Sequence, residues 1–475
     1  MSEATTAASS APCKGVDEVL PAGRLATLGL QHVMVMYAGA VAVPIIIGNA
    51  LNLSREEVAI LINADLLCCG LITLIQAWGI PGFGIRLPVM MGVSFAAVAP
   101  MITIGQDMGL TGIFGACIVA GIFSIAISPI FSRLMGLFPP VVTGTIITVI
   151  GITLMRVGLD WMGGSKMITD PTTGARIVNE NFGSAENLGI AFLVLVVILL
   201  LTKYARGFLA NVAVLIGLLV GFLISMAMGH IDFGAIGDAK WVSVVTPFHF
   251  GMPQFDFAAG AIISLIMIVI MVESLGMFLA LGEICDRPPS REALVRGLRT
   301  DGLGTLVGGI LNTFPHSSFS QNVGLVSVTG VRSRWVCVAG GLFLMALGVL
   351  PKLAFIVAAI PFEVLGGAGI VMFGMVASTG IKILLSADLD TNRYNPYIIA
   401  ISLGLGMIPL VAGDLFANMP DSIKPLLHSG ILLAAVSAIA LNLFFNGLGA
   451  VKATAENDPI GKAADAKAGS TAAAH

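Results

Sequence analysis

The chain has 475 residues, of which 57% are hydrophobic and 11% are charged, and its mean hydropathy is +0.97. A soluble domain carries about 25% charged residues, so this composition excludes an ordinary soluble fold and predicts an all-α polytopic membrane protein. The formal net charge of −3 gives no basic patch of the kind that binding to nucleic acid requires.

Apolar stretches long enough to cross or enter a membrane occur fourteen times along the chain. Two of them, 86–104 and 316–331, are short or interrupted by Pro, Gly and polar residues. The predicted segments in chain order are 25–48, 57–79, 86–104, 110–131, 136–158, 187–204, 208–229, 257–284, 293–312, 316–331, 333–351, 354–381, 396–416 and 425–447.

The basic residues predict the orientation of these segments. With the N-terminus inside, 17 of the 24 Lys and Arg residues fall on the cytoplasmic side, as the positive-inside rule requires. We therefore expect a multi-pass protein of the inner (plasma) membrane with both termini in the cytoplasm. Residues 1–23 form a polar N-terminal segment without a signal-peptide pattern, and the Ala/Lys/Asp-rich tail 448–475 is predicted to be disordered.

Fourteen segments divide into a 7+7 inverted repeat, because an odd number of spans reverses the second copy in the membrane. The two interrupted segments are the third and the tenth, which correspond under this repeat. Paired broken segments indicate a transporter's binding site, since they leave backbone N–H and C=O groups free at membrane depth. Each reads as a short extended stretch followed by a half-helix.

Polar and aromatic side chains gather in these two segments. The third contains Ser94 and Phe95, and the tenth contains Ser320, Gln321 and Asn322. A planar ligand between them would stack on Phe95 and pair with the Gln321 amide, which has both a donor and an acceptor. The alternatives are ordinary packing for Phe95, contacts between helices for Gln321, and bracing of the site for Asn322.

Ionisable residues inside the apolar segments are candidates for proton handling. Glu273 lies deep in the eighth segment, where a charged carboxylate is costly, so it is a candidate proton carrier and substrate ligand or else a structural hydrogen-bond acceptor. Asp301 is a candidate relay or a helix-end charge. His32 is a candidate titrating group or a hydrogen-bond brace, and His316 is interpreted as a cap of the tenth segment.

Neither a metal site nor a disulfide is predicted. The six cysteines show no paired spacing, and the adjacent Cys68 and Cys69 do not suit a tetrahedral site. Buried hydrophobic packing is the expected role of these thiols. The chain also lacks a nucleophile elbow, a zinc-protease motif and a phosphate-binding loop, so an enzyme is not expected.

Several motifs occur together in one order along the chain. They are Gln31-His32, Phe138-Pro-Pro-Val-Val-Thr-Gly144, Glu273, Asp301 and Gln-Asn-x-Gly-x-x-x-x-Thr-Gly at 321–330. This set resembles the nucleobase–ascorbate transporter (nucleobase:cation symporter-2) family, in its bacterial xanthine/uric acid permease branch. The resemblance runs over nearly all of 24–447.

The resemblance implies a division into a core domain, 24–135 and 257–351, and a gate domain, 136–256 and 352–447. It implies a homodimer that imports a purine base with protons as coupling ion, without a further cofactor. Glu273, Gln321 and Phe95 would bind the base with Ser320 beside them, while Asp301, His32 and Asn322 would support proton coupling. A uracil permease, or a channel or anion exchanger of similar architecture, remains the alternative.

Two positions favour uric acid within the xanthine/uric acid branch. Met277, four residues after Glu273, resembles urate-transporting members, whereas xanthine-selective members have an acidic residue there. Ser94 stands where xanthine-selective members often have Asn, and its small hydroxyl leaves room for the additional oxo group of urate. Xanthine is expected as a further substrate.

Overall fold

The computed structural model describes residues 15–131, 137–169, 176–231, 240–419 and 427–456. It is an almost entirely helical assembly, and every predicted apolar segment corresponds to one of its elements. The elements of the first half are α1 (Ala22–Ala50), α2 (Arg55–Trp78), β1 (Met91–Val93), the short 3-10 helix η1 (Phe95–Ala97), α3 (Val98–Ile127), α5 (Pro140–Met162), α6 (Ala185–Tyr204), α7 (Phe208–Asn211) and α8 (Ala213–Ala227).

The second half follows the same plan. Its elements are α10 (Phe257–Ile284), α11 (Arg291–Ile310), β4 (His316–Ser318), α12 (Ser320–Thr329), α13 (Arg334–Gly348), α14 (Pro351–Ala358), α15 (Phe362–Leu384), α16 (Asn395–Val411) and α18 (Gly430–Glu456). In both halves a strand of three residues and a helix that begins at or near the strand's end replace one full span. The predicted all-α fold, with extended stretches in segments three and ten, is therefore confirmed.

Helix ends follow local sequence chemistry. Ser54 caps α2 by accepting the Glu57 N–H, and Glu57 accepts the Ser54 N–H at 2.8 Å. The third and fourth predicted segments are merged in α3, but Gly109 inside it has φ 69° and ψ −170°. Only glycine adopts such a conformation easily, so this residue separates a half-helix from the following span.

By length and hydropathy, eight of the described helices can cross a membrane, or nine if α13 and α14, bent by 81°, count as one span. The remaining segments are α11, the half-helices at the strand pair and the shorter apolar helices α8 and α16. The half-helices, α8 and α16 are too short to pass a length test, and the 20 residues of α11 include the charged residues Arg296, Arg299 and Asp301, so helix length and hydropathy identify fewer spans than the fourteen predicted segments.

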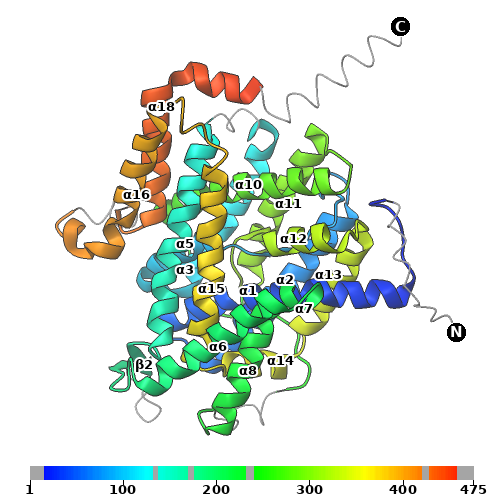
Figure 1. Cartoon of the computed structure of the whole chain (residues 1–475), viewed down its shortest axis with the longest axis vertical. Coiled ribbons are helices and arrows are strands. Elements are labelled where there is room, and N and C mark those ends of the chain that lie inside the picture. Colours follow the sequence, from blue (N-terminus) through cyan, green and yellow to red (C-terminus); the bar gives the residue numbers. More distant parts are fainter. Residues whose placement is uncertain (1–14, 132–136, 170–175, 232–239, 420–426, 457–475) are drawn as a thin grey trace, which may run out of the picture.

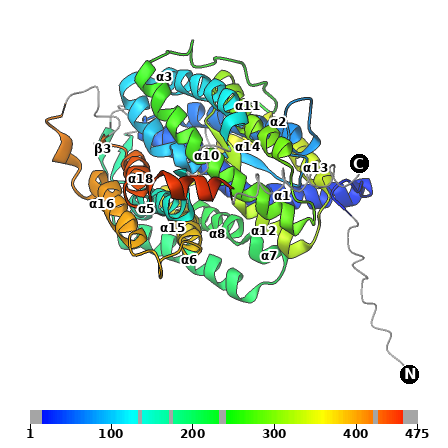
Figure 2. The same cartoon turned by 90° about the horizontal axis from the view of Figure 1, so that it is seen from above.

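The helices pack in two groups. Figure 2 shows α2, α3, α11 and α13 toward the top and α5, α6, α15, α16 and α18 toward the bottom, while in Figure 1 α16 and α18 lie on the left with α5 and α15, and α2 and α13 lie to their right. One group pairs α2 with α13, α3 with α10 and α11, and α1 with α13. The other pairs α5 with α15, α16 with α18, and α6 with α8 and α15. The division into core and gate stays a prediction; α14 packs against α2 and α13, although its residues lie in the range predicted for the gate.

Small residues allow the close approach of α5 and α15, the most extensively packed pair. A Cβ atom added at Gly151 would lie 2.2 Å from the Ala377 nitrogen, and one at Gly366 would lie 2.2 Å from the Met162 nitrogen. Such contacts are typical of membrane helices, whose association depends on packing rather than on water exclusion.

The chain ends differ from the prediction at one boundary. α18 continues to Glu456 after a non-helical Gly447, so the predicted start of a disordered tail at 448 lies inside this helix. Residues 1–14 lie outside the described part of the chain, as do residues 457–475, which are the rest of the predicted tail. A second short strand pair, β2 (Met167–Thr169) with β3 (Arg176–Val178), connects α5 to α6.

Candidate substrate site

The site is built on the antiparallel pair of β1 and β4. Met91 lies opposite Ser318, and Val93 lies opposite His316. The ladder extends at both ends, since the Ser94 N–H donates to the Pro315 carbonyl at 2.8 Å and the Phe319 N–H to the Met90 carbonyl at 3.0 Å. The predicted third and tenth segments are thus in direct contact at their extended stretches.

A helix begins near the end of each strand. η1 and α3 follow β1, and α12 follows β4, so two helix N-termini flank the pair. The first turn of a helix leaves backbone N–H groups without partners inside the helix, and the aligned peptide dipoles give that end a partial positive charge. These ends therefore favour carbonyl oxygens or anionic groups of a ligand.

A cavity lies against this arrangement. Its lining combines residues of both strands and helix starts with one residue of α10 and three residues of the other helix group. The lining residues are Val93, Phe95, Ala96, Ile147, Ile150, Glu273, Ser317, Ser318, Phe319, Ser320, Gln321 and Val376. The cavity is thus bounded by both groups of helices.

Glu273 and Gln321 are the polar side chains with the most hydrogen-bonding capacity in this lining. Among the described residues, the Glu273 carboxyl has no hydrogen bond or ion pair. The Gln321 side chain accepts one hydrogen bond, from the Ser320 hydroxyl at 3.4 Å, which leaves its NH₂ donors available. Unpartnered polar groups at membrane depth are costly, so their presence indicates that a ligand completes them.

Phe95 connects the cavity to the second helix group. Its ring meets Phe373 of α15 edge to face, with the centroids 5.8 Å apart and the planes at 81°. The second helix group contributes Ile147 and Ile150 from α5 and Val376 from α15 to the apolar lining. Phe95 therefore offers a ring surface for a planar ligand and also contacts an element that would move if the two groups separated.

His32 and Asn322 lie together behind the cavity. The Asn322 Nδ2 group is 3.0 Å from the His32 Nδ1 atom and donates to the His32 carbonyl at 2.9 Å. Both residues are buried, and neither belongs to the cavity lining. This contact ties α1 to α12, which is the bracing role considered for both residues.

Asp301 is buried in the interior of α11, so the interpretation as an interfacial helix-end charge is wrong. Its Oδ1 atom accepts from the Gln76 amide at 3.4 Å, and Gln76 also accepts the Ile85 N–H. The Asp301 carbonyl accepts from the Thr305 hydroxyl, which in turn accepts the His316 N–H at 3.2 Å. Asp301 thus supports β4 from behind.

Ser94 and Met277 lie outside the described cavity lining. The Ser94 hydroxyl is buried and accepts the Ala96 N–H at 3.3 Å, so it caps η1. Met277 is partly buried against the apolar cluster that contains Leu275 and Phe278. Ser94 directly precedes Phe95, and Met277 lies one helical turn after Glu273 on α10, so both can shape the cavity only through these neighbours.

Sequence reasoning missed the cavity residues Ile147, Ile150 and Val376. They stand in uninterrupted apolar runs, where one lipid-facing or core residue looks like another, so no sequence signal marks them. Ser317, Ser318 and Phe319 lie within the identified tenth segment but were not singled out. A separate surface depression beside α11 is lined by Gly82, Pro129, Arg291, Glu292, Val295, Arg296 and Arg299, and it has no aromatic or amide groups.

Comparison with known proteins identifies the family. The model of the Permease family (Xan_ur_permease) matches residues 23–415. The chain belongs to this permease family. It is 54% identical to the uric acid transporter UacT of Escherichia coli over 92% of this chain and 89% of the relative. It is 42% identical to the xanthine permease of Bacillus subtilis over 89% of this chain and 94% of the relative.

Solved structures share the architecture at low sequence identity. The transmembrane domain of a cyanobacterial bicarbonate transporter, BicA, aligns with a TM-score of 0.51 and 13% identity over 90% of this chain and 98% of that chain. The murine Slc26a9 anion transporter in the inward-facing state aligns with a TM-score of 0.57 and 12% identity over 90% of this chain and 69% of that chain. These likenesses establish the fold, which is compatible with fourteen spans in an inverted repeat.

Proposed function

We propose that this permease imports a purine base, uric acid and with it xanthine, by proton-coupled alternating access. The observation that carries the proposal is the cavity beside the β1–β4 pair, whose lining combines an aromatic ring, a carboxyl group without a partner among the described residues and an amide whose NH₂ donors are available. Relatives whose names state uric acid or xanthine transport, at 54% and 42% identity, support the substrate class.

A purine fits the chemistry of the cavity. Its rim alternates N–H and C=O groups, which Glu273 and Gln321 match as acceptor and as donor with acceptor. Backbone N–H groups at the start of α12 provide a further contact to the rim of the purine. The Phe95 ring provides a contact to the face of the purine. Desolvated polar pairs of this kind give specificity, because a ligand without the matching group leaves them unpaired.

Proton coupling is assigned to Glu273. Protonated from outside, it removes a charge from the cavity and favours closure together with the bound base. The proton and the base must each bind the transport-competent state better than the other state, because only then is transport of the base coupled to transport of the proton. Asp301, His32 and Asn322 keep β4 and α12 in place while the coupling proton is carried.

The moving parts of this proposal are the two helix groups. The group of α5, α6, α8, α15, α16 and α18 acts as the gate and rocks against the core that carries the strand pair. The Phe95–Phe373 contact lies between them. We further propose, from the distribution of basic residues, that the protein lies in the inner membrane with both termini in the cytoplasm, and the family resemblance predicts a homodimer.

Uptake of radiolabelled urate in transporter-deficient cells tests the proposal. Excess unlabelled xanthine, uracil and ascorbate are added in turn, with and without a protonophore. We expect uptake that xanthine inhibits, that uracil and ascorbate leave unchanged, and that the protonophore abolishes. Urate uptake that persists with the protonophore contradicts proton coupling, and absence of urate uptake with binding of another base contradicts the assignment of substrate.

The shared fold with anion transporters supports one second candidate, an anion exchanger. Exchange of bicarbonate or chloride in proteoliposomes tests it directly. We expect no exchange above empty liposomes, because the lining described for the cavity contains Glu273 and no basic side chain.

A further inference from the structure

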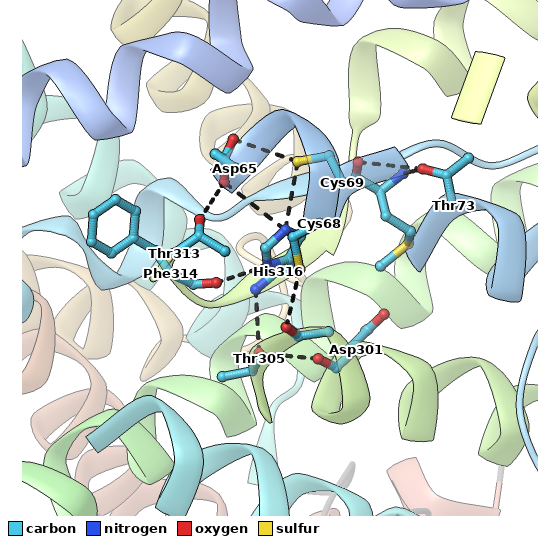
Figure 3. Close-up of polar contacts among 11 residues, drawn as sticks. Asp65, Cys68, Cys69, Thr73, Asp301, Thr305, Thr313, Phe314 and His316 are labelled. Carbon is cyan, nitrogen blue, oxygen red and sulfur yellow. Dashed lines mark hydrogen bonds and ion pairs between the residues drawn. The ribbon is translucent and has the colours of Figure 1, made fainter. Parts of the chain in front are cut away.

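A second group of polar side chains lies behind the strand pair, away from the cavity. Asp65 and Cys69 stand one turn apart on the same face of α2, and His316 is the first residue of β4 (Figure 3). All three residues are at most 1% exposed. One ligand atom from each lies within 4.8 Å of the others. None of them lines the cavity, and the transport mechanism above does not use them.

Two of the three distances between these atoms match those in a zinc coordination shell. The Cys69 Sγ atom is 3.5 Å from the His316 Nε2 atom and 3.5 Å from the Asp65 Oδ2 atom. A tetrahedral zinc ion with bonds of about 2.3 Å to sulfur and about 2.0–2.1 Å to nitrogen or oxygen places sulfur about 3.5 Å from those ligands. The His316 Nε2 atom is 3.9 Å from the Asp65 Oδ1 atom.

The histidine is held in the tautomer that binds metal. Its Nδ1 atom is 2.7 Å from the Phe314 carbonyl oxygen, which can only accept a hydrogen bond. The Nδ1 atom therefore carries the proton, and the Nε2 lone pair faces Cys69. A ring fixed in this way by a backbone carbonyl is the usual support of a metal-ligating histidine. The Thr313 hydroxyl orients the carboxylate similarly, donating to Asp65 Oδ1 at 2.7 Å.

When Asp65 is ionised, hydrogen bonds within the group leave one buried acceptor without a donor. The Cys69 thiol has one proton, yet both Asp65 Oδ2 and His316 Nε2 are acceptors at the same distance from it. One of the two is then left without a donor in a fully buried place, which costs about 1–3 kcal/mol. A divalent cation satisfies all three, and with one carboxylate and one thiolate it gives a net charge of zero.

We propose that Asp65, Cys69 and His316 bind a thiophilic divalent metal ion, for which Zn²⁺ fits best. The metal ties α2 to β4, directly before Ser317 and Ser318 of the cavity, so its role is to fix the strand that carries the substrate site. Since the site is closed, the ion enters during folding and resists removal by chelators.

Metal analysis of the purified full-length chain tests this proposal independently of transport. The protein is expressed with added zinc, purified through a tag without histidines, washed with EDTA and analysed by mass spectrometry. We expect ~1 zinc ion per chain in the wild type. Wild-type protein without bound metal overturns the proposal and favours a proton shared within the group.

Cys68 provides a matched control for Cys69. It is equally buried, but its Sγ atom faces the Gly304 carbonyl at 3.8 Å and lies outside the group. We expect Cys69→Ser to lower the zinc content at least about tenfold and Cys68→Ser to leave it unchanged. Equal zinc in both variants means adventitious binding and overturns the proposal.

A measurement on the wild type alone covers the case in which Cys69→Ser fails to fold. X-ray absorption at the zinc edge is expected to show one sulfur at about 2.3 Å and nitrogen or oxygen ligands at about 2.0–2.1 Å. A shell without sulfur, or with more than one, excludes the site. Purine binding to the same samples reports on the proposed function separately, so failure of either idea leaves the other testable.

Discussion

The two faces of the β1–β4 pair differ in how completely their polar groups are satisfied. On the cavity face, Glu273 has no partner among the described residues, and Gln321 accepts a single hydrogen bond. On the opposite face, Asp65, Cys69 and His316 contact one another, and Thr313 and Phe314 contact them in turn. The same two strands thus separate polar groups that are available to a ligand from polar groups whose partners are other protein groups.

This difference predicts opposite effects of substitution. Changes on the cavity face alter binding and transport and spare stability, because few protein contacts are lost. Changes on the opposite face alter stability, because partners are left buried without hydrogen bonds.

The largest effect is expected for Glu273→Gln. The substitution keeps the shape of the side chain but removes the group that takes up a proton, so uphill accumulation of substrate is lost. A hydrogen bond to a charged group contributes about 1.5–3 kcal/mol, which corresponds to roughly 10- to 150-fold in affinity. Uptake with and without a protonophore measures this, with membrane abundance as control. Uphill accumulation by the variant would contradict the coupling mechanism.

Thr313→Val tests the opposite face. It removes the hydroxyl that donates to Asp65 and preserves the shape of the side chain. We expect a loss of about 1–3 kcal/mol in stability, measured as a lower melting temperature in detergent. Thr379→Val is the control and should change stability little, because among the described residues the Thr379 hydroxyl bonds only the Met375 carbonyl of its own helix. Equal melting temperatures for the two variants would contradict a tightly satisfied group.

Gly92→Ala tests the boundary between the two faces. A Cβ atom at this position would lie 2.2 Å from a ring carbon of Phe319, which lines the cavity. Overpacking of this kind costs about 1–3 kcal/mol and displaces the ring. We expect reduced stability together with weaker substrate binding. Gly324→Ala, where an added Cβ meets nothing within 4 Å, is the control.

Gln321→Ala is expected to weaken substrate binding without lowering the melting temperature. Loss of one or two neutral hydrogen bonds costs about 1–2 kcal/mol, or roughly 5- to 30-fold in affinity. Competition of unlabelled urate against labelled urate measures the change. A variant that loses stability but not affinity would place Gln321 among the structural groups instead.

The smallest effect concerns Asp17, in front of α1. Partial burial raises the pKa of Asp17, but hydrogen bonds from Arg334 and Arg287 outweigh this, so the net shift is below its usual value. The stabilisation is therefore present above the unfolded pKa of about 3.9 and is lost as the pH falls through the lower folded pKa. Asp17→Asn should cost under about 1 kcal/mol at neutral pH, and this cost should vanish once the pH is below the folded pKa of Asp17, measured by melting temperature against pH.

The sequence predicted much of the cavity but little of the group behind it. Glu273, Gln321, Phe95 and Ser320 could be identified because polar or aromatic residues in an apolar run with broken helices are conspicuous. Ile147, Ile150 and Val376 could not, since an apolar residue in an apolar helix has no distinguishing local pattern. For Asp301 the sequence left a relay and a helix-end charge open, because linear spacing does not tell which depth in the fold a residue occupies.

The proposed metal site of Asp65, Cys69 and His316 shows most clearly what could not be predicted from the sequence. Cys68 and Cys69 were interpreted as packing residues because they are adjacent and have no paired cysteines. His316 follows them by more than two hundred positions, so no spacing rule connects it with α2. Only the pairing of β4 with β1 places its ring against Cys69, and only the Phe314 carbonyl selects its tautomer.

Composition and hydrophobic patterning by themselves determined that this chain is a membrane protein, how many segments it has and which two are broken. Those properties depend on transfer of residues from water to lipid, which is a property of each segment alone. The tertiary structure decided which residues share the cavity, which brace it and which are closed behind it. These depend on contacts between segments far apart in the chain, and hydropathy does not encode those contacts.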